Sequence, residues 1–498
     1  MATDPRALDV AASIIALCVV ATAPASIAAQ RPLEPLSELE RIAVGEGPAL
    51  ELTHVLVSVD RHHPAVEIAE ARVRATSGAR LSAEGAFDPT LSASAHAAPL
   101  GYYSYARADV SLTQATPLWG TSFVAGWRIG RGSGAGIPDY YGNYETLDGG
   151  ELRVGATVPL WRDGPIDSRR AGIARTERAE DAAMLDRDAR VLRVQLAGAE
   201  AYYRWAAAGL RLAVAQSLLD IADERDAQIA GRVAAGAIAA FEHLENRRAV
   251  LERRQAVIAA RRAIERTAIQ LSLFVRGSDG APRVASVREV PDAIAIPTSR
   301  AQAEDVLVER ALTARPELAR YLQLREAARV SIELAENQIA PRIDLSVLGT
   351  FDVGGGASGP MQQSQLGMPV LETWLLFSLP LGMREARGRA DAARADLDAI
   401  TAEQELAADQ VRIEVRDALS AVRAALDALE IAEQSATVAE AVARGERARF
   451  DEGATSLLIV NLREIAAAQA RATLIDAQAE LAYSLARLRV VTGESPAP

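Results

Sequence analysis

Two prolines in each half of the sequence stand at the same spacing, and this duplication limits the fold more than any other feature. Pro64 and Pro89 in the first half are as far apart as Pro316 and Pro341 in the second half. Between each pair, the apolar residues recur at the spacing of a helix. After the second proline of each pair they alternate with a period of two, which is the period of a strand. We therefore predict two copies of one plan, each with a short helix followed by strands.

Two segments show the strand alternation clearly. In "ELRVGATVPL", residues such as Leu152 and Val154 point to one face, while Glu151 and Arg153 point to the other. The segment "DLSVLGTFDV" from residue 344 alternates in the same way, with Leu348 as the exception. Both segments are predicted to be strands with one apolar face.

Further strand candidates complete a set of four, two in each half. They are "TLSASAHAA" from residue 90 and "ETWLLFSLPL" from residue 372. The first half alone also contains "DVSLTQA" and "SFVAGWRIG", which read as an extra hairpin. Most aromatic residues fall in these strand regions, as expected for the aromatic girdles of a membrane barrel, although aromatic residues also favour soluble strands.

Each strand region is followed by a very long helical stretch. Residues 169–231 and 385–449 contain no proline and are rich in Ala, Arg, Glu and Leu. A glycine turn follows each stretch, near Gly236 and Gly453, and a shorter helix then returns. Apolar residues three and four apart predict that the helices of each hairpin pack as a coiled coil. A soluble coiled-coil scaffold would explain these hairpins but not the strands.

The N-terminus carries an apolar stretch that ends in small residues. We expect residues 1–28 to be a signal peptide cleaved near Ala28 or Ala29, and a membrane anchor is the alternative. The only cysteine, Cys18, lies in this stretch after Leu17 instead of a small residue, which argues against a lipoprotein. Beyond residue 30 the sequence has no apolar run of the length of a transmembrane helix, so membrane insertion of the mature chain would require strands.

Composition and motifs argue against several classes of function. The net charge of −12 is unfavourable for binding nucleic acid, which requires a basic surface. The sequence has no lysine, so it can contain neither a phosphate-binding Walker loop nor a Schiff-base lysine. His62 and His63 are the only adjacent histidines, and we expect them to be exposed before a helix instead of binding a metal. We therefore predict no enzyme, no cofactor and no metal site.

Strand number predicts an oligomer. Four strands, or six with the extra hairpin, leave open edges that lipid cannot satisfy with hydrogen bonds. Closed membrane barrels start at about eight strands. Several chains would therefore have to share one barrel.

The order of these elements resembles the TolC-type outer-membrane efflux proteins. The matching segments include "HHPAVEIAEA", "RPELARYLQL", "APRIDLSV", "FSLPLGMREARGRADAARADLDA" and the turn "ARFDEGATSLLIVNLREIAAAQ". The resemblance covers residues 52 to 493, and the order and duplication of the segments carry it. It implies a mixed α and β membrane protein, a homotrimer with four strands per chain in a shared twelve-strand β-barrel, and a periplasmic α-barrel of long helical hairpins.

The resemblance also implies a function. The protein would be the outer-membrane exit duct of a tripartite efflux or type I secretion system in a Gram-negative-type bacterium. It would extend into the periplasm, contact outer-membrane lipid, and accept substrates from an inner-membrane transporter through a periplasmic adaptor protein. The alternative from another class is a periplasmic helical scaffold or adaptor-like protein without a pore.

Carried onto this sequence, the resemblance places the adaptor-contacting residues at the two hairpin turns. The first turn lacks the Ser/Thr character of the second. Three acidic residues near the turns could surround a closed aperture and select cations, although they could equally be solvated turn residues. The candidate adaptor contacts are Gly236, Ala237, Gly453, Ala454, Thr455 and Ser456, and the candidate aperture acids are Asp451, Glu452 and Glu242.

The sequence thus divides into nine expected segments. These are a signal peptide (1–28), an N-terminal segment with the first short helix (29–88), the first strand region with an external loop (89–160), the first long helical hairpin (161–277), a connector (278–312), the second short helix (313–340), the second strand region (341–381), the second long helical hairpin (382–493) and a C-terminal tail (494–498).

Overall fold

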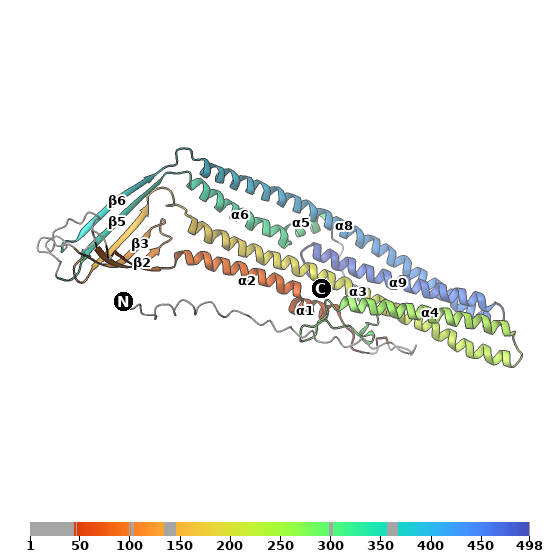
Figure 1. Ribbon diagram of the computed structural model, residues 1–498. Coiled ribbons are helices and arrows are strands. Elements are labelled where there is room, and N and C mark those ends of the chain that lie inside the picture. Colours follow the sequence, from red (N-terminus) through yellow and green to blue (C-terminus); the bar gives the residue numbers. More distant parts are fainter. Residues whose placement is uncertain are drawn as a thin grey trace, which may run out of the picture. The chain divides into compact units, whose positions relative to one another are not determined.

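A computed structural model describes most of the chain after the expected signal peptide. The described residues are 44–45, 47–98, 100, 104–133, 146–297, 302–355 and 367–497. The signal peptide and its cleavage site lie outside them. Figure 1 shows that the strands lie at one end of the long helices, and that the turns to the return helices lie at the other end.

The two halves of the chain repeat one order of elements. The first half contains α1 (Leu52–His62), α2 (Pro64–Glu84), η2 (Gly85–Phe87), β1 (Thr90–Ala98), β2 (Ser104–Ala115), β3 (Ser122–Ser133), β4 (Glu151–Pro159), α3 (Ser168–Ala234) and α4 (Ala240–Leu271). After η3 (Val287–Glu289), the second half contains α5 (Glu304–Ala314), α6 (Pro316–Asn337), β5 (Arg342–Asp352), β6 (Val370–Ser378), α8 (Arg384–Asp451) and α9 (Leu457–Val491).

Proline sets the first helix boundary in each half. Pro64 and Pro316 each occupy the first helical position, where the missing N–H costs nothing, and the residue before each is extended. Two helices therefore precede the strands in each half. The expected connector 278–312 is accordingly not entirely irregular, because α5 begins within it at Glu304.

The strands form one antiparallel sheet of six strands in the order β1-β2-β3-β4-β5-β6. The extra hairpin, β2 and β3, is part of this sheet and lies between β1 and β4. The two halves meet where β4 pairs with β5, and there the hydroxyl groups of Thr157 and Ser346 are 2.9 Å apart. The prediction of long helical hairpins combined with antiparallel strands is confirmed.

The sheet has one apolar face and one polar face, because its strands alternate in register. On the apolar face the most exposed side chains are Leu91, Val154, Leu371, Leu375 and Phe377. The polar face carries ion pairs between strands. Arg128 on β3 pairs with Glu151 on the neighbouring β4, and Arg153 on β4 reaches across β3 to Asp109 on β2 at 3.4 Å.

The long helices pack side by side. Helix α3 contacts α2, α6, α4 and α9, and α8 contacts α6 and α9. The largest core lies where α1, α3, α4 and α9 meet, around the fully buried Trp205, Leu212 and Leu271. None of the described helices contains a stretch that is both long and apolar enough to cross a membrane.

Candidate functional site

The first helix turn has the geometry of a Schellman cap. Gly236 has a φ of 71°, and its N–H donates to the carbonyl of Val233 at 2.9 Å. The N–H of Ala237 donates to the carbonyl of Arg232, also at 2.9 Å. An added Cβ at Gly236 would meet no atom within 4 Å. Glycine is therefore needed here for its backbone conformation and not for space.

The second helix turn repeats this geometry. Gly453 has a φ of 74°, its N–H donates to the carbonyl of Phe450 at 2.9 Å, and the N–H of Ala454 donates to that of Arg449 at 2.7 Å. Ser456 occupies the N-cap position of α9, but its side chain makes no capping bond. The two turns therefore share a backbone structure although only the second contains Thr455 and Ser456.

The three candidate aperture acids lie at these turns. Asp451 is the last residue of α8 and Glu452 is its C-cap, and both are exposed. Glu242 lies in the first turn of α4 and is half-buried. The structure thus brings Asp451 and Glu452 together on one turn, with Glu242 on the other. No hydrogen bond or ion pair joins any of their side chains to another of the described residues.

Large apolar side chains next to the turns are exposed. The largest exposed fractions are 68% for Phe241 and 65% for Leu244, both in the first turns of α4. On α9, Leu458 and Leu462 are 51% and 57% exposed. No motif in the sequence marks these residues. Their position directly after the glycine turns, outside the apolar spacing of the coiled coil, is the feature that could have identified them.

A buried cluster of charges joins the two helical hairpins close to the glycine turns, on the side of the strands. The side chain of Glu464 on α9 is fully buried. Arg253 on α4 donates to its Oε2 at 2.8 Å, and Arg447 on α8 donates to its Oε1 at 2.7 Å. Arg225 on α3 donates to both oxygens. One carboxylate therefore binds arginines from three other helices.

Asn461, one helical turn before Glu464, completes the cluster. Its Oδ1 accepts hydrogen bonds from Arg225 at 3.1 Å and from Arg253 at 3.2 Å. Burial alone would raise the pKa of Glu464, but the hydrogen bonds and charges of Arg225 and Arg253 outweigh this effect and lower it. Glu464 is therefore ionised at neutral pH and holds the hairpins together as an anion.

Glu464 belongs to no motif in the sequence, although the residues around it indicate that it is buried. Val460 and Ala467 lie on the same side of α9, and both are buried. A carboxylate on such an apolar stripe requires a cationic partner. The partners themselves could not be identified, because they come from three other helices.

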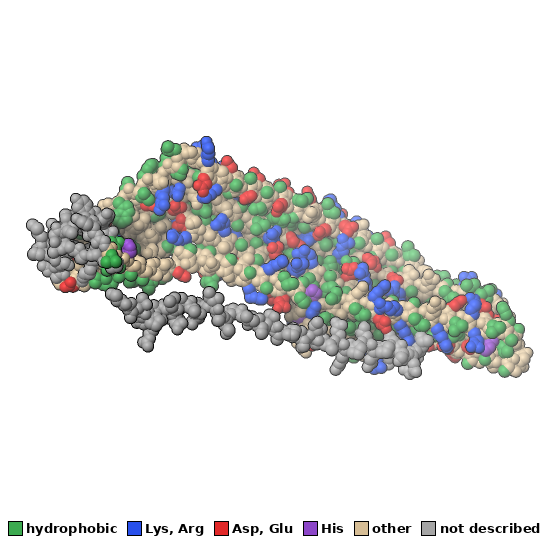
Figure 2. All heavy atoms as spheres, viewed as in Figure 1, with side chains coloured by type: hydrophobic (Ala, Val, Ile, Leu, Met, Phe, Trp, Pro, Cys, Tyr) green, Lys and Arg blue, Asp and Glu red, His purple; other side chains and the backbone are tan. Residues whose placement is uncertain are grey.

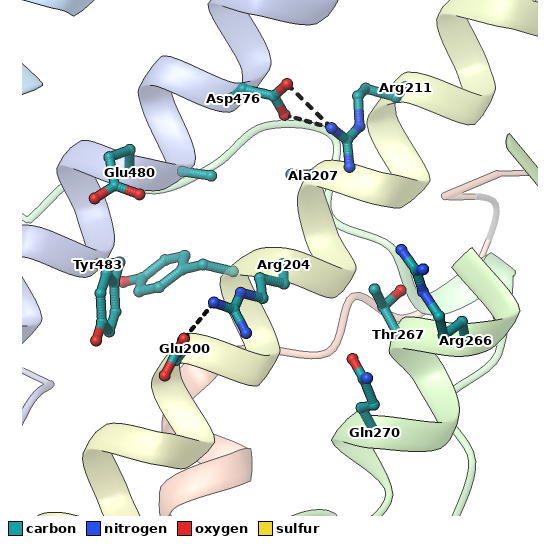
Figure 3. Close-up of a pocket in the computed structure, with 12 residues that line it drawn as sticks. Glu200, Arg204, Ala207, Arg211, Arg266, Thr267, Gln270, Asp476, Glu480 and Tyr483 are labelled. Atoms are coloured by element: carbon teal, nitrogen blue, oxygen red, sulfur yellow. Dashed lines mark hydrogen bonds and ion pairs between the residues drawn. The ribbon is translucent and has the colours of Figure 1, made fainter. Parts of the chain in front are cut away.

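A cavity of about 540 Å³ lies where α3, α4 and α9 meet (Figure 3). Arg211 on α3 crosses to Asp476 on α9 with bonds of 2.8 and 3.0 Å, and Arg204 pairs with Glu200 on α3 itself. Three arginines and three carboxylates line this cavity, so their charges cancel. Its lining includes Glu200, Arg204, Arg211, Arg266, Asp476 and Glu480. This cavity is therefore close to neutral.

Within the described ranges, no three His, Cys, Asp or Glu side chains come together as a possible metal site. The arrangement shown by the structure is a two-faced sheet carried on two helical hairpins, which are joined by charged contacts.

One family model matches the C-terminal part of the chain. Residues 307–494, from α5 to just beyond α9, match the family model described as "Outer membrane efflux protein". Among curated proteins, no sequence matches the chain.

Solved structures match nearly the whole chain. VceC from Vibrio cholerae, an outer membrane protein, is 17% identical with a TM-score of 0.61, over 89% of this chain and 96% of VceC. A membrane protein from Pseudomonas aeruginosa is 17% identical with a TM-score of 0.61, over 93% of this chain and 99% of its own. The open state of the MtrE outer membrane channel from Neisseria gonorrhoeae is 16% identical with a TM-score of 0.61, over 89% of both chains. At these identities the likeness is one of fold.

Proposed function

We propose that this chain, which has the TolC-like fold, is an outer membrane efflux protein, and that three copies of it close one barrel in the outer membrane and continue it as a helical duct into the periplasm. Members of this family are transport channels and not enzymes. The protein is thus the outer-membrane channel of a tripartite efflux system.

The observation that carries the proposal is the two-faced sheet. Its exposed apolar face, with Val154 at 61% and Leu371 at 72%, suits lipid, and its ion-paired polar face suits a water-filled lumen. In a helical scaffold that stays in water, such an apolar face would remain exposed to solvent, which is unfavourable. The outer strands β1 and β6 each have one unpaired edge within the described sheet, and lipid cannot satisfy such edges. Neighbouring copies would pair β1 with β6.

The extra hairpin changes the expected size of the barrel. The twelve strands implied by the family resemblance need four strands per copy, whereas the sheet here has six. Three copies of a six-stranded sheet would close a barrel of eighteen strands. Barrels of about 16–18 strands enclose an aqueous channel, so the pore in the membrane would be wider.

We infer that the helix turns are the contact site for a periplasmic adaptor. The exposed apolar residues Phe241, Leu244, Leu458 and Leu462 would form the contact with a periplasmic adaptor, beside the glycine turns at Gly236 and Gly453. Exposed apolar groups at one end of a helical hairpin are suited to receive a partner helix. The carboxylates of Asp451, Glu452 and Glu242 would then lie near the aperture that an inner-membrane transporter supplies through the adaptor.

Cysteine cross-linking between the outer strands tests the proposal. The only natural cysteine lies in the expected signal peptide, so introduced thiols have no competitor in the mature chain. Single cysteines would replace Ser92, Ser94 or His96 on β1 and be combined in pairs with cysteines at Glu372 or Trp374 on β6. These positions all lie on the polar face. At least one pair should form disulfides that convert the chain to covalent trimers in outer membranes.

The matched control places the two cysteines on inner strands, at Gly126 on β3 and Thr350 on β5. Both residues are already paired with strands of the same copy, so no link between copies should form. If every β1–β6 pair left the chain monomeric, or gave only dimers, the shared barrel would be wrong.

A further inference from the structure

A second hollow in the helices differs in charge from the cavity of Figure 3. It has a volume of about 550 Å³ and lies over α3, between α2 and α6. Figure 2 shows basic side chains gathered over the middle of the helices, where α3 and α6 run side by side. We call this hollow the arginine groove. Five arginines line it, which are Arg72, Arg187, Arg190, Arg193 and Arg320.

The arginine groove has more positive charge than its carboxylates can balance. Asp186 is the only acidic residue of its lining, and it pairs with Arg320 at 3.0 Å. Arg187 pairs with the neighbouring Asp188 at 2.6 Å. Among the residues that the structure describes, no carboxylate lies within 4.0 Å of the guanidinium nitrogens of Arg72 or Arg190. The groove is therefore positive, on a chain whose net charge is −12.

The floor of the arginine groove is apolar and made of small residues. Ala179, Ala182 and Ala183 on α3 line it together with Leu324 of α6, and Ala182 is buried. Short side chains on the central helix leave the space that the long arginines surround. A volume of this size holds an organic molecule, and planar guanidinium groups bind sulfonate, carboxylate or phosphate oxygens in pairs.

Both walls of the groove come from one copy of the chain. Helix α3 lies between α2 and α6, and α8 follows α6 in the same row. The groove is centred on α3 and not on an outer helix of this row. It is therefore complete without a neighbouring copy.

From these observations we infer that the arginine groove is a binding site for organic polyanions, molecules with an apolar body and two or more negatively charged groups. Arg72 on α2 and Arg190 on α3 bind the anionic groups from two sides, and the alanine floor packs against the apolar body. That such molecules are cargo of the duct rests on the proposed function. Their binding to the groove does not.

Binding is tested with a fluorescent pyrene trisulfonate dye, added to the full-length protein in an uncharged detergent at fixed ionic strength. The wild-type protein should bind the dye saturably. The variant Arg72→Gln/Arg190→Gln should bind it at least about tenfold more weakly, because each substitution removes a charged hydrogen-bond donor. Ala183→Leu should also weaken binding, because it fills the floor without changing any charge.

The control is Arg211→Gln, which removes an arginine from the same helix α3 but lies in the neutral cavity of Figure 3. It should leave the affinity within about twofold of the wild type, as expected for a site that it does not touch. Absence of saturable dye binding would overturn the inference, and so would an affinity that neither Arg72→Gln/Arg190→Gln nor Ala183→Leu lowers. The assay reads binding whether or not the chain trimerises, so its result is separate from that of the cross-linking test.

Discussion

Replacing Glu464 by glutamine should loosen the contact between the two helical hairpins. The substitution keeps the size of the side chain but removes its charge, leaving Arg225 and Arg253 without a counter-ion. Their side chains are only 10% and 4% exposed, so water cannot replace the carboxylate. Removing one partner from a buried ion pair typically costs about 3–5 kcal/mol. Arg447 is 38% exposed and can turn toward solvent. We therefore attribute this free-energy cost to the two buried arginines alone.

Amide hydrogen exchange measures this cost locally, under conditions in which closing is faster than exchange. A loss of about 3–5 kcal/mol raises the exchange rate roughly a hundredfold to a few thousandfold. The increase should appear in residues 246–257 of α4 and 457–470 of α9. The control Glu440→Gln removes one member of an exposed pair with Arg444 on α8, and should change exchange by less than about tenfold. If Glu464→Gln exchanged like this control, the cluster would not hold the hairpins together.

The same cluster predicts a pH dependence. The pKa of Glu464 is lowered in the folded protein from its ordinary value of 4.5. Its contribution to stability is therefore fully present above pH 4.5 and is lost as the pH falls through the lower, folded-state pKa. Once the slower intrinsic exchange at low pH is divided out, exchange in the two segments should accelerate below this pH in the wild type, and this acceleration should be smaller in Glu464→Gln. An equal acceleration in both proteins would assign the acid sensitivity to other groups.

Three further results are expected. Gly236→Ala and Gly453→Ala should each cost about 1–2 kcal/mol, because an L-residue is strained at positive φ, and faster exchange in the last turn of the preceding helix would show it. Leu375→Arg should destabilise the sheet in lipid vesicles by up to about 2–4 kcal/mol in urea titrations, whereas Glu372→Arg on the polar face should not. Trp205→Ala should lower stability by about 3–5 kcal/mol in thermal melts followed by circular dichroism, because the side chain is fully buried in the largest core.

Much of the fold follows from the sequence because its periods are local. The alternation in residues 90–98 is visible because one face of β1 is apolar, and the long helices are visible because nothing interrupts their spacing. Helix α5 begins within the expected connector because the segment directly before it, residues 288–302, contains Pro291 and Pro297. The Schellman turns could be located from a glycine after each helical stretch.

The side-chain clusters could not be predicted in the same way. Glu464 meets Arg225, Arg253 and Arg447 only because four helices are in one register, and helical periodicity does not fix the register between helices. The arginine groove has the same origin, because Arg72 and Arg320 come from different helices and line it with the arginines of α3. Each cluster depends on contacts between residues far apart in the sequence.

The pairing of β4 with β5 has a mechanical consequence when it is considered together with the Glu464 cluster. The strand pairing joins the two halves of the chain at the strand end of α3 and α8. The cluster joins them near the turns, where Arg225 and Arg253 of the first half bind Glu464 of the second. Helices that are fixed to each other at both ends can bend or rotate between these points. They cannot slide along one another without breaking a strand ladder or separating buried charges. Any movement that changes the width of the duct at the turns must therefore take place between the cluster and the turns, or it must disrupt the cluster.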